Sequence, residues 1–99
     1  MRNPFYTDYV RHCMRFYARN PVGIHFKTNV DRANWCACQI AIEDYSDRDK
    51  DILIRVYSGY DTLADNVYEV AKLYDIDQNI IWELLKEFER ALAKKRGLI

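Results

Sequence analysis

Four polar side chains near the C-terminal end of the chain have the types and spacing to recognise the edges of nucleic-acid bases. They are Gln78, Asn79, Glu83 and Lys86. Gln and Asn can pair with adenine through a donor and an acceptor, and Glu can accept a hydrogen bond from the amino group of cytosine. We predict that these residues form a base-reading surface on one helix; the alternative is the ordinary polar face of a packed helix.

Six basic side chains in two groups are candidates for phosphate contact. Arg11, Arg15 and Arg19 recur every four residues, which places three guanidinium groups along one ridge of a helix. Three more basic residues, Lys94, Lys95 and Arg96, end the last predicted helix. The alternatives are a solvated ridge that pairs with acidic parts of the chain, and a charge cluster that stabilises the negative end of a helix dipole.

The middle of the chain is acidic and offers a different kind of surface. Residues 31–77 carry eleven acidic against five basic side chains. The aspartates that could contact a basic partner, or take the place of nucleic-acid phosphates, are Asp47, Asp49, Asp51, Asp61 and Asp65. Trp82 and Ile80 could anchor a protein partner, since aromatic residues dominate binding hot spots. Burial of Trp82 against the first helix is the alternative.

The pattern of residues predicts neither catalysis nor a cofactor. We find no Ser/His/Asp or Cys/His arrangement with a supporting motif, no phosphate-binding loop and no HExxH sequence. Cys36 and Cys38 would point about 200° apart on a helix, so they could not easily share one ion. His12 and His25 are too loosely placed to complete a tetrahedral site. We therefore expect structural cysteines, no metal, and a protein that is not an enzyme.

Length and composition indicate one globular domain. The 99 residues are 49% hydrophobic and 30% charged, with a net charge of zero. Only three Gly and two Pro interrupt the chain, which favours helices over many short strands. There is no apolar run long enough to span a membrane and no apolar leader, and the cysteine count is odd. We expect a cytoplasmic protein with reduced thiols and no membrane contact.

Helical periodicity and capping signals predict an all-α fold, a compact domain of five helices. Asn3 and Asn29 are the expected caps of the first two helices, Ser46 and Thr62 those of the next two, and Asp77 that of the last. Residues 20–28 form the expected loop, and Gly59 and Gly97 the expected stops. The predicted helices are 4–18, 30–44, 47–58, 63–74 and 78–96.

The second half of the chain, residues 46–96, resembles region 4 of bacterial sigma factors. The resemblance rests on the charged-to-aliphatic stretch SDRDKDIL at 46–53 and on EVAKLYDID at 69–77. There a small Ala71 allows two helices to approach, and Ile76 fills the space beneath a tight turn. Asp75 stands where that family usually has Gly, and Asp tolerates the left-handed backbone such a turn requires. Ile81 and Leu85 match buried positions of a recognition helix.

The resemblance implies a helix-turn-helix protein that binds double-stranded DNA and regulates transcription, like the short sigma-like regulators of phages and mobile elements. It also implies contact with RNA polymerase. The family usually has several Arg or Lys on its recognition helix, whereas this chain has Glu83 and Trp82 there. A second hypothesis is therefore a protein-interaction module, such as an anti-CRISPR-like inhibitor that binds a basic host enzyme through an acidic face. A third is a homodimer through the first helix and Trp82.

The charge around residues 78–86 distinguishes the first two hypotheses. Basic residues from the first helix lying beside this surface would favour DNA. Glu83 and Glu87 merging with the aspartates into one acidic face would favour a basic protein partner. How the first helix docks decides between these outcomes, and periodicity does not determine it.

Overall fold

The computed structural model describes residues 3–20, 22 and 25–99, and these residues form five α-helices and no strand. The helices are α1 (Thr7–Arg19), α2 (Asn29–Ile42), α3 (Asp47–Ser58), α4 (Leu63–Tyr74) and α5 (Gln78–Lys95). The predicted all-α, five-helix fold is confirmed. Pro21, Gly23 and Ile24, which belong to the loop predicted at 20–28, lie outside the described residues.

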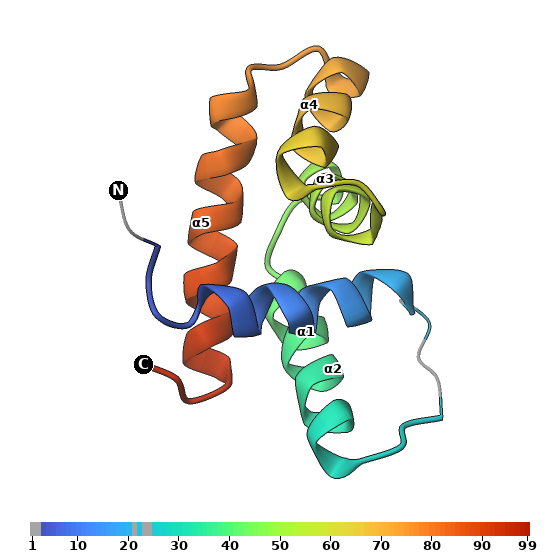
Figure 1. Ribbon diagram of the computed structural model, residues 1–99, viewed down its shortest axis with the longest axis vertical. Helices are drawn as coiled ribbons and strands as arrows, with labels where there is room; N and C mark the ends of the chain where they lie inside the picture. The colour runs from blue at the N-terminus through green and yellow to red at the C-terminus, as the bar shows by residue number, and fades with distance from the viewer. Residues whose placement is uncertain (1–2, 21, 23–24) are drawn as a thin grey trace.

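The longest helix, α5, contacts all four others and organises the fold (Figure 1). Its first half lies beside α4 and α3, and its second half beside α2. Helix α1 crosses in front of α5 and packs on α2 and α3 as well. All five helices contribute to one core, whose largest fully buried side chains include Tyr57, Phe88 and Met14.

Local capping explains where the last three helices begin. The side chains of Ser46 and Thr62 accept hydrogen bonds from the backbone N–H groups three residues later, at 3.2 Å in each case. The Asp77 carboxylate accepts from Asn79 N at 2.7 Å. These three predicted caps are confirmed. In α2 the prediction was one residue late, because Thr28 caps the helix and Asn29 is its first residue.

The start of α1 was wrongly predicted at Pro4. The helix begins at Thr7, and its N-cap residue Tyr6 makes no side-chain capping bond. Thr7 is buried, and residues 3–4 line a cleft against Trp82 of α5. Packing on α5 therefore overrides the local pattern in which Asn3 would cap a helix that starts at Pro4.

The turn between α4 and α5 has the backbone predicted for it. Asp75 adopts a left-handed conformation, with φ 53° and ψ 50°. The N–H of Ile76 then bonds to the carbonyl of Ala71 at 3.1 Å, and the Ile76 side chain packs half-buried against the core. This bond closes the end of α4 as a left-handed C-terminal residue typically does. Three residues thus join the two helices.

Gly59 is required where α3 ends because another side chain fills the space beside it. A Cβ atom at this position would lie 2.5 Å from Cγ and Oδ1 of Asn66. The Asn66 side chain is buried, and its Nδ2 donates to the carbonyl of Val56 at 2.9 Å. A methyl group at residue 59 therefore displaces a side chain that closes the end of α3.

We expect Gly59→Ala to lower the free energy of unfolding by about 1–3 kcal/mol, the usual range for overpacking. The backbone of Gly59 is an ordinary one (φ −63°), so without the clash alanine would stabilise slightly. Urea unfolding followed by circular dichroism measures the effect. In an Asn66→Ala background the same substitution should cost far less. An equal cost in both backgrounds would contradict the steric explanation.

Candidate functional site

The exposed face of α5 carries the residues that the sequence singled out. Gln78, Asn79, Glu83 and Lys86 are all exposed, whereas Ile81 and Leu85 are buried. Trp82 is half-buried beside the segment that precedes α1, so it is not a fully exposed anchor. Ile80 is half exposed, at 50%. The four predicted base-reading residues therefore share one accessible helix, and their role stays a prediction.

A groove runs along α5 between this helix and the start of α3, and we call it the acidic groove. It consists of two adjoining hollows of about 210 and 370 Å³ that share Asp49, Leu84 and Glu87. The apolar side chains along it are Ala41, Tyr45, Ile52, Ile80, Ile81, Leu84 and Ala91. The carboxylates along it are Asp44, Asp49, Glu83 and Glu87, and the cations are Arg48 and Lys95.

The Tyr45 side chain lies close to three of these carboxylates, and they affect the pKa of its phenol. Burial, then the Glu87 carboxylate, and further Asp49 and Asp44, raise the pKa of the Tyr45 phenol to about 12. Its hydroxyl donates to Glu87 Oε1 at 3.4 Å. Arg48 pairs with Asp49 at 3.1 Å, which offsets part of the negative charge. Three acids from the α2–α3 connection, α3 and α5 thus act on one phenol.

The raised pKa of Tyr45 predicts a loss of stability at high pH. The unfolded chain releases the phenol proton near its ordinary pKa of 10.0, whereas the folded protein holds it to about 12. Stability from this group is therefore complete below pH 10 and falls as the pH rises towards 12. We expect near-ultraviolet absorbance titration to show a late tyrosine step that Tyr45→Phe removes and Glu87→Gln shifts to lower pH. An unshifted step in Glu87→Gln would contradict the role of that carboxylate.

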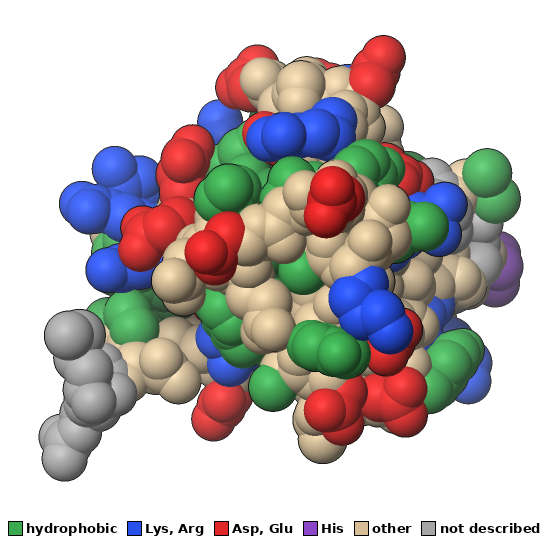
Figure 2. Space-filling view, turned by 90° about the horizontal axis from the view of Figure 1, so that it is seen from above, with side chains coloured by type: hydrophobic (Ala, Val, Ile, Leu, Met, Phe, Trp, Pro, Cys, Tyr) green, Lys and Arg blue, Asp and Glu red, His purple; other side chains and the backbone are tan. Residues whose placement is uncertain are grey.

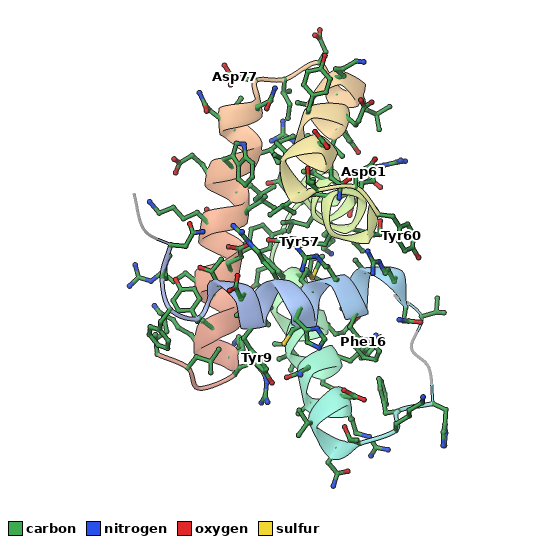
Figure 3. All side chains as sticks on the ribbon, in the orientation of Figure 1. Tyr9, Phe16, Tyr57, Tyr60, Asp61 and Asp77 are labelled. Carbon is green, nitrogen blue, oxygen red and sulfur yellow. The ribbon has the colours of Figure 1, made fainter. Side chains whose placement is uncertain are left out.

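The five predicted aspartates are spread along α3, the α3–α4 connection and the start of α4. Asp47 and Asp49 lie at the start of α3, whereas Asp65 lies in the first turn of α4 and Asp61 in the α3–α4 connection, where Figure 3 labels it. Asp51 accepts hydrogen bonds from Tyr74 and from Arg55 Nε, which lower the pKa of its carboxyl group. Only Asp49 of the five lines the acidic groove, where Glu83 and Glu87 of α5 join it.

Two of the three arginines on the α1 ridge form hydrogen bonds to other parts of the fold. Arg11 Nε donates to the carboxylate of Glu89 at 2.9 Å. Arg19 donates to the carbonyls of Ser58 and Gly59 at the negative end of α3, and lies 4.2 Å from the centre of the Tyr60 ring. Arg15 is exposed. Phosphate contact by this ridge stays a prediction, and its exposed members are Arg15 and Arg19.

A buried carboxylate joins three helices, and sequence reasoning missed it. Glu89 is 6% exposed, and its Oε2 accepts from both Arg11 Nε and Tyr57 Oη, the latter at 2.5 Å. Tyr57 lies between α1, α3 and α5 (Figure 3), and burial first, then Glu89, raise the pKa of its phenol well above the usual value. The sequence did contain a signal for the burial of Glu89, because helical spacing places it on the same buried face of α5 as Leu85 and Phe88.

Comparison with protein-family models, curated proteins and solved structures found no match.

The other predicted residues are distributed over several places. Lys94 and Lys95 are exposed, but Arg96 Nε donates to Asn34 Oδ1 at 2.6 Å and ties the end of α5 to α2. Cys13 and Cys38 are buried and Cys36 is exposed. Among the described residues no three His, Cys, Asp or Glu side chains gather as metal ligands. None of the described helices is long and apolar enough to cross a membrane.

The face that contains the α4–α5 turn carries charges of both signs. Figure 2 looks down on this turn and shows acidic and basic side chains interspersed; no continuous basic patch covers the described residues in that view. Near the start of α5, Asp75 and Asp77 add negative charge where a DNA backbone would approach a recognition helix. The described charges in this view therefore do not form the continuous basic patch that is typical of nucleic-acid-binding domains.

Proposed function

We propose that the protein is an interaction module whose acidic groove binds a basic, amphipathic segment of a partner protein. The observation that carries this proposal is the convergence of Asp44, Asp49 and Glu87 around Tyr45, beside an apolar surface that includes Ile80. An apolar groove with charged edges is the usual receptor for an amphipathic helix. The negative edge selects positive flanks on that helix.

The dimensions of the groove suit such a segment. It follows α5 from Ile80 to Lys95, which corresponds to about 22 Å at the rise of an α-helix. Ile80 is half exposed and Leu84 half-buried, so a partner could cover apolar area without any rearrangement of the core. Enzymes that handle nucleic acids carry basic surfaces. We therefore propose a basic host nucleic-acid enzyme as the partner class, as expected for an anti-CRISPR-like inhibitor.

A direct binding measurement tests the groove. The probe is a synthetic amphipathic helix with Leu at every third and fourth position and Lys on both flanks, titrated into the protein at several salt concentrations. We expect salt-sensitive binding, with amide NMR shifts concentrated at Tyr45, Ile80 and Leu84. A peptide with Glu in place of Lys is the control. Absence of binding by the Lys peptide, or equal binding by both, would reject the proposal.

A second proposal, a sigma region 4-like DNA reader, is favoured by the α4–α5 connection. The left-handed Asp75, the three-residue turn and the exposed Gln78, Asn79 and Lys86 are what such a recognition unit requires. Contact with RNA polymerase would follow from the same resemblance. Fluorescence anisotropy against a mixed duplex pool tests it: binding that weakens steeply with salt and with Lys86→Ala would favour DNA. No binding at low salt would remove this candidate.

A further inference from the structure

A third hollow lies between α5 and the N-terminal segment, and we call it the N-terminal cleft. It separates the segment before α1 from α5 and has a volume of about 440 Å³, within the range of small-ligand pockets. Its walls include the aromatic rings of Tyr6 and Trp82 together with Leu85. Its charged residues are Arg11, Glu83, Lys86 and Glu89.

The buried carboxylate of Glu89 has one oxygen available to the cleft. Both hydrogen bonds that it accepts from described residues go to Oε2. Every fully buried side-chain oxygen or nitrogen among the described residues has a partner. Oε1 has none among them, so it keeps access to solvent, and the cleft that Glu89 lines provides that access. An acceptor in such surroundings favours a charged donor, because a charge-assisted hydrogen bond is stronger there than in open water.

Two further charged side chains in the cleft are available to a ligand. Glu83 and Lys86 stand three residues apart on α5, both are exposed, and neither forms an ion pair with another described residue. The cleft thus offers carboxylates for a cation, an ammonium for an anion and two aromatic rings for an apolar group. The charges balance, so a ligand with a single net charge would meet repulsion as well as attraction.

We propose that the N-terminal cleft binds a small zwitterion with a large apolar side chain, a free α-amino acid. Its ammonium group donates to Glu89 Oε1 and faces Glu83, its carboxylate meets Lys86, and its side chain packs on Trp82 and Tyr6. Glu83 lines both the acidic groove and the cleft, but this inference does not depend on the groove, because Trp82, Lys86 and Glu89 line the cleft alone.

Titration of the wild-type protein with L-phenylalanine tests the site. The indole N–H of Trp35 is already bonded to the carbonyl of Asn20 at 2.7 Å, so it serves as an internal reference. We expect the indole signal of Trp82 to shift and that of Trp35 to stay. Phenylethylamine and hydrocinnamate, which keep only one of the two charges, should bind about tenfold more weakly or worse. No shift at Trp82, or equal binding of phenylethylamine, would overturn the proposal.

Lys86→Ala provides the matched variant, with Arg90→Ala as its control, because Arg90 is exposed on the same helix and does not line the cleft. Lys86→Ala should weaken L-phenylalanine about tenfold and leave phenylethylamine unchanged or improved. Arg90→Ala should alter neither. Equal losses in the two variants would show that the cleft does not recognise the carboxylate. Amide spectra of each variant confirm that the fold is retained.

Discussion

Glu89→Ala is expected to lower the free energy of unfolding by about 3–5 kcal/mol, the usual cost of removing one partner of a buried ion pair. The substitution leaves the Arg11 guanidinium, only 20% exposed, without its carboxylate. It also leaves the hydroxyl of fully buried Tyr57 without an acceptor. Since small domains are stable by about 5–15 kcal/mol, this single change removes a large part of the total.

Urea unfolding followed by tryptophan fluorescence measures this cost, and Glu83→Ala is the matched control. Glu83 is the same residue type on the same helix, but it is exposed and should contribute within about 0.5 kcal/mol. Tyr57→Phe combined with Glu89→Ala completes a double-mutant cycle. We expect the two changes together to cost clearly less than their sum, because both remove the same hydrogen bond. A cost below about 1 kcal/mol for Glu89→Ala would contradict a structural role for this carboxylate.

Charge reversal at the acidic groove is expected to abolish most binding of a basic partner segment. Glu83→Lys with Glu87→Lys places two cations where the proposed partner presents its own. Like charges brought together across an interface cost several kcal/mol. We expect the affinity for the Lys-flanked peptide to fall about a hundredfold, which corresponds to about 2.7 kcal/mol. Anisotropy of the labelled peptide at constant ionic strength measures the change.

The control for this reversal is a second double variant with the same change in net charge. Asp61 and Glu69 are exposed on the α3–α4 connection and on α4, and neither lines the acidic groove. Asp61→Lys with Glu69→Lys should reduce peptide affinity only slightly. If both double variants lose affinity equally, net charge and not the groove governs binding.

Local signals in the sequence were sufficient for helices whose ends are capped by their own neighbours. The bounds of α3 and α4 were predicted correctly, since Ser46, Thr62 and Gly59 act within a few residues of the helix ends. The start of α1 was not, because contact with α5 decides it. A capping residue works on backbone groups next to it, and its signal is lost where a distant helix supplies the stronger contacts.

In the candidate site too, features set by neighbouring residues could be predicted, and contacts between distant helices could not. The exposed positions of α5 followed from its period, and Gln78, Asn79, Glu83 and Lys86 are accessible as expected. The residues that lie next to this face of α5 could not be predicted from the sequence. Asp44 and Asp49 reach the acidic groove only because α3 packs on α5. Nor could spacing reveal that Arg11 turns towards Glu89, which is 78 residues away. Which side of α1 faces α5 depends on the complete core.

The bond between Arg11 and Glu89 also has a consequence for synthesis on the ribosome. Glu89 is synthesised 78 residues after Arg11, and Arg96 is synthesised 62 residues after Asn34. Until α5 has left the exit tunnel, α1 and α3 have no carboxylate to share, and the core lacks Phe88 and Leu92. We therefore expect nascent chains that end before residue 89 to remain sensitive to protease, and protection to appear in one late step.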